Sequence, residues 1–175
     1  QAVAAAPDAD ALICRNERLS YRELSRRVDR VAANLAARGL GAGERVGIVV
    51  GNSNEFAIAV LGALRLGAIA VPLSIREQRE GLSYVLRDCA ASAVIHDAEL
   101  AAKIPAGAVV PSLRYRFAVG GDVDGAEPFG VLLSDQAPNP PPSLVAEGNT
   151  AVILYTSGTT GRPKGAMLTH LNLVH

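Results

Sequence analysis

The sequence has few cysteines and no net charge, and each of these features argues against certain classes of protein. Only two cysteines are present, Cys14 and Cys89, with no CxxC pair and no histidine cluster. This pattern favours neither a zinc site nor a disulfide framework, and a reducing, cytoplasmic setting fits it best. Basic and acidic residues both total 17. This balance removes the general electrostatic argument for nucleic acid or an anionic membrane as partner.

Long apolar runs are also absent. The stretch at residues 56–73 is interrupted by Gly62, Arg65, Gly67 and Pro72. The N-terminus lacks the basic start and apolar centre of a secretory signal. We therefore expect a soluble protein without a transmembrane segment. Hydrophobic residues make up 49% of the 175 residues, which is enough to drive folding of one domain or of part of a larger one.

Alternating helical and strand patterns predict an α/β fold. Ser20 and Glu23 form a capping-box pattern, and apolar residues at helical spacing continue to Gly39, which predicts a helix between these points. Strand patterns follow at 45–50, 68–73 and 92–96, and helical patterns at 55–66, at 78–90 and around Glu99. Strands joined by helical crossovers indicate an open, mostly parallel sheet with helices on both faces, of Rossmann-like type.

Residues 120–149 differ from the rest of the chain in amino-acid composition. They are rich in Gly, Pro, Asp and Asn, and they include PNPPP, which can form neither a helix nor a central strand. We expect a loop-rich linker here, with a short strand at FGVLL, residues 129–133. Residues 150–170 then predict a strand, a loop and a second strand, with a new helix starting at Leu171.

The glycine-rich stretch YTSGTTGRPKGAM, residues 155–167, combines groups that suit an anionic ligand. Glycines permit positive φ angles and close approach of the backbone. Backbone amides, several hydroxyls and one ammonium together meet the needs of a polyphosphate, because each oxygen must exchange water for a comparable donor. Only two of the 17 basic residues are lysines. Because lysine is so rare in this sequence, its presence in this short stretch is not expected by chance. The candidate phosphate-binding residues are Thr156, Ser157, Gly158, Thr159, Thr160, Gly161 and Lys164.

This stretch differs from the common nucleoside-triphosphate loop G-x-x-x-x-G-K-[ST]. Counted from Gly158, the second glycine position holds Pro163, and Gly165 replaces the Ser or Thr that would bind magnesium. A P-loop NTPase is therefore disfavoured. The residues alone leave another interpretation open, a glycine-rich strand connection whose hydroxyls face solvent.

The wider sequence resembles the adenylate-forming, AMP-binding superfamily. That superfamily includes acyl-CoA and aryl-CoA ligases, luciferases and the amino-acid-activating domains of peptide synthetases. LYTSGTTGRPKGAMLTH, residues 154–170, is closely similar to its signature. Residues 19–73, from LSYREL to AIAVPL, are similar to its N-terminal region in order and spacing. The resemblance covers roughly residues 19–174 and is weakest at 105–147.

The resemblance implies that ATP activates a carboxylic acid. In the family, the carboxylate attacks the α-phosphorus, pyrophosphate leaves, and a thiol captures the acyl-adenylate. By analogy, the six residues from Thr156 to Gly161 would wrap the β- and γ-phosphates, and Lys164 would add positive charge for the departing pyrophosphate. Thr156 would also lie beside Mg²⁺. We expect no catalytic side chain here. His170 is a possible acid or base, but we interpret it as a locally packed residue at a helix start.

SGTTG followed by GAMLTH resembles CoA ligases more than peptide-synthetase domains. We therefore expect a fatty or aromatic acid as substrate and CoA as acceptor. Two alternatives stay open: an amino-acid- or acyl-activating domain of a synthetase, and a non-catalytic binding or assembly module that keeps the fold. A kinase-like ATPase is a weaker third, and it would produce ADP, whereas an adenylating enzyme produces AMP.

Family members are much longer than 175 residues. We therefore expect residues 1–175 to form the N-terminal part of an AMP-binding domain, with the rest of the large domain and a small C-terminal domain lying outside it. The adenine pocket, the acid tunnel and a magnesium-binding glutamate would belong to those parts. The isolated 175 residues should then not catalyse exchange between ATP and pyrophosphate. Apolar surface left uncovered in the isolated chain would promote oligomerisation.

Overall fold

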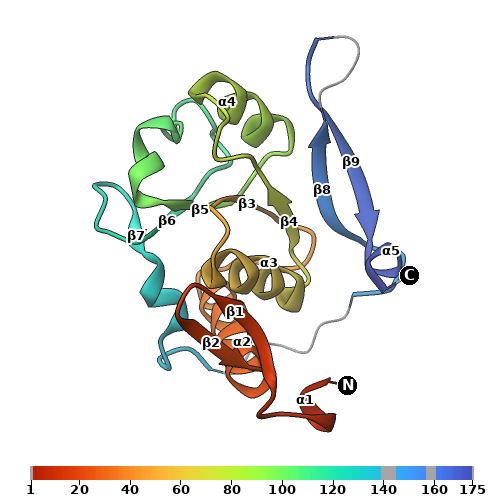
Figure 1. The fold of residues 1–175 in the computed structure, drawn as a ribbon. Coiled ribbons are helices and arrows are strands. Elements are labelled where there is room, and N and C mark those ends of the chain that lie inside the picture. The colour runs from red at the N-terminus through yellow and green to blue at the C-terminus, as the bar shows by residue number, and fades with distance from the viewer. Residues whose placement is uncertain (1, 139–144, 157–160, 175) are drawn as a thin grey trace.

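The computed structural model describes residues 2–138, 145–156 and 161–174. Within these ranges, the strands form a seven-stranded sheet in the order β7-β6-β5-β3-β4-β8-β9 and a separate two-stranded sheet, β1-β2 (Figure 1). Neighbouring strands of the large sheet pair in parallel, except for the antiparallel β8–β9 pair at one edge. The mostly parallel sheet predicted from the sequence is therefore confirmed.

Most predicted elements form where the sequence places them, with boundaries shifted by a few residues. The helices are α1 (Ala2–Ala5), α2 (Tyr21–Ala37), α3 (Asn54–Leu66), α4 (Arg79–Asp88) and α5 (His170–Val174), and the 3-10 helices are η1 (Ala98–Lys103) and η2 (Phe129–Leu133). The strands are β1 (Asp10–Cys14), β2 (Glu17–Ser20), β3 (Arg45–Val49), β4 (Ile69–Pro72), β5 (Ala93–Asp97), β6 (Tyr115–Val119), β7 (Glu127–Pro128), β8 (Thr150–Thr156) and β9 (Lys164–Thr169).

Helix α2 begins at the predicted cap. Ser20 is the N-cap residue, and its Oγ accepts a hydrogen bond from the backbone N–H of Glu23 at 3.2 Å. The Glu23 carboxylate is engaged further along the helix, where Nε of Arg26 donates to it at 3.0 Å and Nε of Arg27 at 2.7 Å. These hydrogen bonds, that from Arg26 first, lower the pKa of Glu23 to about 2.

The end of α2 also follows the sequence. Gly39 has a φ of +79°, a left-handed conformation that favours glycine. The N–H groups of Gly39 and Leu40 donate to the carbonyls of Ala36 and Leu35, which is the hydrogen-bond pattern of a Schellman motif. Leu40 is buried directly after the turn, so the cap also fixes the path of the chain toward β3.

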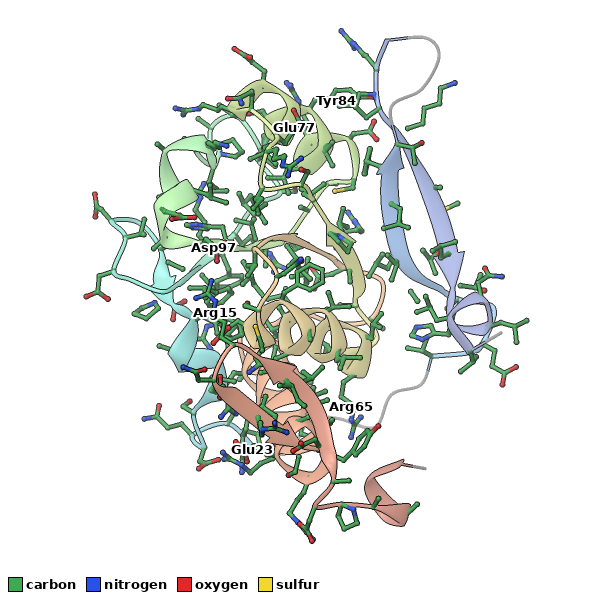
Figure 2. All side chains as sticks on the ribbon, viewed as in Figure 1. Arg15, Glu23, Arg65, Glu77, Tyr84 and Asp97 are labelled. Atoms are coloured by element: carbon green, nitrogen blue, oxygen red, sulfur yellow. The ribbon has the colours of Figure 1, made fainter. Side chains whose placement is uncertain are left out.

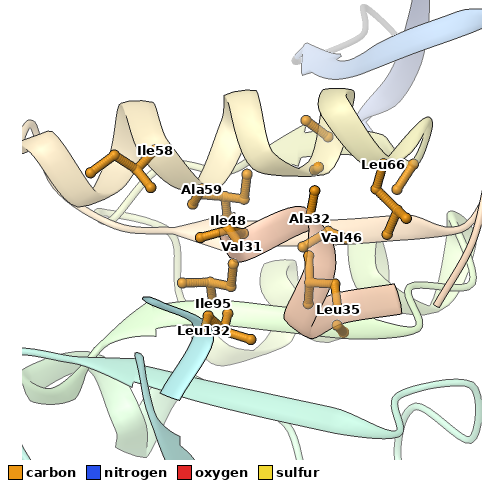
Figure 3. Close-up of a cluster of buried hydrophobic side chains, with 14 of the residues drawn as sticks. Val31, Ala32, Leu35, Val46, Ile48, Ile58, Ala59, Leu66, Ile95 and Leu132 are labelled. Atoms are coloured by element: carbon orange, nitrogen blue, oxygen red, sulfur yellow. The ribbon is translucent and has the colours of Figure 1, made fainter. Parts of the chain in front are cut away.

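Apolar layers cover both faces of the sheet, as predicted. Because side chains alternate along a strand, Val46 and Ile48 of β3 face α2 and α3, whereas Val49 faces α4. Figure 3 shows the first layer, where α2 and α3 meet β3 and β5. Gly47 lies on the α4 face, and a Cβ there would be 2.5 Å from Cδ2 of Leu86. Glycine at this position therefore lets α4 approach the sheet closely.

The prediction was wrong or incomplete in three places. It missed the β1–β2 hairpin before α2, and it missed β6 and β7, which extend the sheet beyond β5. Arg114 and Arg116 interrupt the apolar pattern around β6. FGVLL, predicted as a strand, is the 3-10 helix η2. Phe129 and Leu132 are both buried, and a spacing of three places them on one side of a 3-10 helix but on opposite faces of a strand.

Asn34 attaches the segment after β7 to helix α2. Its side chain is buried, and Nδ2 donates to the carbonyls of Leu132 at 3.1 Å and Ser134 at 2.9 Å, as well as to that of Arg30 at 3.0 Å. Residues 132–134 of the predicted linker are therefore held against helix α2.

We predict that Asn34→Leu destabilises the protein by about 1–3 kcal/mol, because it leaves buried carbonyls without a donor. Urea denaturation of the variant and the wild type would measure the difference. A free energy of unfolding within about 0.5 kcal/mol of the wild-type value, the range of an ordinary surface substitution, would contradict the proposed role of Asn34.

Candidate functional site

The predicted phosphate loop connects the paired strands β8 and β9. Thr156, the last residue of β8, is the cross-strand partner of Lys164, the first residue of β9. The loop therefore leaves and rejoins the hairpin at the same point. The structure places three of the predicted residues, Thr156, Gly161 and Lys164. The other four lie outside the described residues: Ser157, Gly158, Thr159 and Thr160.

The two described polar residues lie together on the hairpin. Cross-strand partners carry their side chains on the same face, so the Thr156 hydroxyl and the Lys164 ammonium share one face, and both residues are exposed. Gly161 has a φ of +90°, in the region that favours glycine. The base of the loop thus presents a hydroxyl and a cation beside a sharply turning backbone.

The distal half of β8 extends beyond its neighbour β4, whose ladder with β8 contains the single pair Ala70 and Val152. The N–H of Ile69 donates to the carbonyl of Glu44, just before β3, at 2.7 Å, and the N–H of Leu73 donates to the carbonyl of Ile48 in β3 at 2.9 Å. Residues two apart in a parallel strand bond toward the same side, so the N–H position of Pro72 faces β8. Proline has no N–H. The ladder between β4 and β8 therefore stops below the loop.

Helix α4 contacts the hairpin where the ladder has ended. The Tyr155 hydroxyl donates to Oδ2 of Asp88 at 2.6 Å, and the Tyr84 hydroxyl donates to the carbonyl of Pro163 at 3.3 Å. The Arg162 guanidinium lies over the Tyr84 ring, 5.7 Å from its centroid. Figure 2 shows Tyr84 between α4 and the base of the loop. Burial, followed by the bond to Asp88, raises the pKa of Tyr155 above its ordinary value.

Sequence reasoning missed these contacts. Tyr84 and Asp88 are four residues apart, a spacing that places both side chains on one face of a helix. That spacing was the only signal in the sequence, and it does not identify the hairpin as the partner.

Gly165 allows the Tyr155 ring to lie across the hairpin. These two residues are cross-strand partners. A Cβ on Gly165 would be 3.2 Å from Cζ of Tyr155 and 2.8 Å from Cγ2 of Ile153. A side chain at this position would therefore displace the ring that reaches Asp88.

A separate cavity of about 660 Å³ lies at the carboxyl ends of β3, β5 and β6. Open α/β sheets commonly bind ligands at this edge. The lining includes Arg15, Ser53, Asp97 and Glu99, of which Arg15 and Asp97 are labelled in Figure 2. Oδ2 of Asp97 accepts a hydrogen bond from the backbone N–H of Gly51 at 2.8 Å. The described loop residues do not line this cavity.

His170 lies at the other end of β9 from the loop. The strand runs from Lys164 to Thr169, a length of about 20 Å at the rise of an extended strand. The backbone N–H of His170 donates to the carbonyl of Asn149 at 3.1 Å. Its Nε2 is buried and has no hydrogen-bond partner in the described part of the chain. This position supports a structural role at the start of α5.

Among the described residues, no group of three or more His, Cys, Asp or Glu side chains could hold a metal ion. Thr156 offers one exposed hydroxyl oxygen at the loop. A single hydroxyl fits a Mg²⁺ ion that is held mainly by nucleotide phosphates and water, which is how proteins commonly bind Mg²⁺.

Known proteins match the chain along its whole length. Residues 1–175 match the family model of AMP-binding enzymes. The chain is 35% identical to one of the proteins of the linear gramicidin synthase of Brevibacillus parabrevis over 175 residues, which are 100% of this chain and 2% of that protein. It is 38% identical to a feruloyl-CoA synthase of Amycolatopsis sp. over 167 residues, which are 95% of this chain and 31% of that protein.

Solved structures of similar enzymes also match nearly the whole chain. The anthranilate CoA ligase AuaEII in complex with anthranoyl-AMP matches with a TM-score of 0.89 at 27% identity, covering 95% of this chain and 32% of that one. The apo structure of MbtA from Mycobacterium smegmatis matches with a TM-score of 0.87 at 30% identity, covering 99% and 33%.

The chain therefore belongs to the AMP-binding enzyme family, within the adenylate-forming superfamily. Its fold matches the N-terminal subdomain of these enzymes. It spans a third or less of the length of the four relatives named above. In the described ranges, no helix is both long enough and apolar enough to cross a membrane.

We predict that Gly165→Ala destabilises the protein by about 1–3 kcal/mol, because the added methyl group overpacks against Ile153 and Tyr155. Chemical denaturation would measure the change. Gly148→Ala is the matched control, since a Cβ there would meet nothing within 4 Å. Equal stabilities of the two variants would show that the hairpin tolerates displacement of the Tyr155 ring.

Proposed function

We propose that this chain supplies the triphosphate-binding loop of an ATP-dependent ligase that activates a fatty or aromatic acid and transfers it to CoA. The observation that carries this proposal is the pairing of Thr156 with Lys164, which brings a hydroxyl and a cation together at the base of a glycine-rich loop. Family membership and the likeness to named CoA ligases support it. In this proposal, residues 1–175 are the N-terminal part of an AMP-binding domain.

The reaction explains why this site needs donors rather than a nucleophile. A carboxylate oxygen of the acid attacks the α-phosphorus of ATP. The bond from that phosphorus to the bridging oxygen breaks, and its electron pair leaves with pyrophosphate. Negative charge therefore increases on the leaving group, where preorganised donors lower the barrier most. The donors are the hydroxyls and backbone amides of the loop and the ammonium of Lys164.

Magnesium would add charge neutralisation at the same phosphates. Thr156 is the residue of this chain that would lie beside the ion, with the nucleotide providing most of the oxygen ligands. The protein's own contribution in this region is to hold the phosphate chain in line for displacement.

A second candidate function differs in the acceptor thiol. Linear gramicidin synthase and feruloyl-CoA synthase resemble this chain to nearly the same degree, which keeps an adenylation domain of a synthetase as an alternative. Phosphate binding is common to both functions. Incubating the full-length protein with ATP and a panel of fatty, aromatic and amino acids, and then with CoA or a carrier-protein thiol, would separate them. A protein that releases no pyrophosphate with any acid would favour a non-catalytic module.

We predict that Lys164→Ala and Thr159→Ala, made in the full-length protein, each lower the rate of acid-dependent exchange between ATP and pyrophosphate by about ten- to a thousandfold, the usual effect of losing one anion-stabilising donor. Lys103→Ala is the matched control. Lys103 donates to the carbonyl of Ile75 on another part of the surface, so exchange should stay near the wild-type rate. Near-normal exchange in both loop variants would contradict the proposed clamp on pyrophosphate, and ADP as product would indicate a kinase-like ATPase.

A further inference from the structure

We propose that helix α4 is a positioning element for the phosphate loop, acting through Tyr84 and Asp88 on the two strand ends that flank it. The functional part of this inference rests on the proposed function above. The structural part, that α4 anchors the hairpin, rests on contacts between described residues.

The hairpin needs an anchor because sheet pairing does not reach the loop. Pro72 ends the ladder between β4 and β8, and β9 is the edge strand of the described sheet. Between Val152 and the loop, β8 pairs with β9 alone among the described strands. An isolated two-stranded hairpin is marginally stable in water. The position of the loop relative to the sheet therefore depends on lateral contacts.

Helix α4 is well placed to provide them, because its other face is fixed in the core. Leu82, Val85 and Leu86 are buried against the sheet. Tyr84 and Asp88 lie one helical turn apart and reach the hairpin. A rigid helix thus carries two hydrogen-bonding groups at the spacing of one turn.

The two contacts hold opposite sides of the loop. Asp88 accepts from Tyr155, the residue before Thr156. Tyr84 donates to the carbonyl of Pro163, the residue before Lys164, and its ring also lies beneath the Arg162 guanidinium. Each contact therefore fixes the backbone next to one of the two described polar residues of the proposed clamp. Holding catalytic groups through such supporting contacts reduces the entropy that binding must remove.

This arrangement predicts which ligands are affected. The loop is proposed to hold the β- and γ-phosphates, so loosening it should weaken binding of ATP and pyrophosphate while leaving AMP binding unchanged. A general loss of stability would weaken all three together.

The test uses Tyr84→Phe in the full-length protein, which removes the hydroxyl and keeps the ring for Arg162. Tyr115→Phe is the matched control, because the Tyr115 hydroxyl also donates to a backbone carbonyl, that of Arg38 at 2.7 Å, away from the loop. By calorimetry, we expect Tyr84→Phe to weaken Mg-ATP and pyrophosphate binding by about three- to tenfold, the effect of one lost hydrogen bond. AMP affinity should stay within about twofold of wild type. Tyr115→Phe should leave all three affinities at wild-type values.

Asp88→Leu tests the other side of the loop, and Asp88→Asn, which keeps an acceptor for the Tyr155 hydroxyl, should restore most of the lost affinity. Hydrogen exchange provides a readout that does not depend on enzymatic activity. We expect faster amide exchange in residues 154–166 of Tyr84→Phe and Asp88→Leu, with unchanged exchange in β3 and β5.

The outcomes separate this inference from the proposed function. Wild-type exchange rates in residues 154–166 of both variants would overturn the anchoring role whatever the enzyme does. Faster exchange with unchanged ATP affinity would overturn the positioning role and leave the ligase proposal standing. A wild-type protein that binds neither ATP nor pyrophosphate would overturn the proposed function, and the positioning role with it.

Discussion

The antiparallel pairing of β8 with β9 is the interaction on which the candidate site depends. Without it, Thr156 and Lys164 would be separate points on a long connection; with it, they are cross-strand partners on one face. The pairing also limits the conformations of the intervening loop, because both of its ends are fixed at a single place. A short loop closed in this way loses less entropy when it wraps a ligand than an open chain of the same length.

That pairing needs support from the rest of the fold, and the support comes from the α4 face of the sheet. Gly47 lets α4 lie close to β3, and Gly165 lets the Tyr155 ring lie across the hairpin toward Asp88. In both places, the absence of a side chain permits a contact that a methyl group would prevent. The core of the sheet and the base of the loop are therefore connected through one helix.

Sequence patterns predicted the features whose cause is local. The cap at Ser20 and the buried strand β3 follow from residues close together in the chain. Strand β6 was missed because Arg114, just before it, and Arg116, within it, interrupt the apolar pattern, although pairing with β5 holds its backbone. The wider motif identified the family that the comparisons confirm, whereas phosphate binding by the loop and the roles of its individual residues stay predictions. Tyr84 and Asp88 were not predictable as anchors, since they look like ordinary polar positions of an amphipathic helix. Their contacts with Pro163 and Tyr155 join segments that are far apart in the chain.

The position of the hairpin also separates the loop from the carboxyl edge of the sheet. The cavity at the carboxyl ends of β3, β5 and β6 and the loop at the end of β8 are built from different residues. Changes that reshape the cavity need not move the loop, because the loop is held from α4 and not from the carboxyl edge of the sheet. Conversely, the proposed role of α4 means that a substitution on its outer face would alter phosphate binding without touching any residue that lines the cavity. The loop and the cavity are therefore held by different parts of the fold.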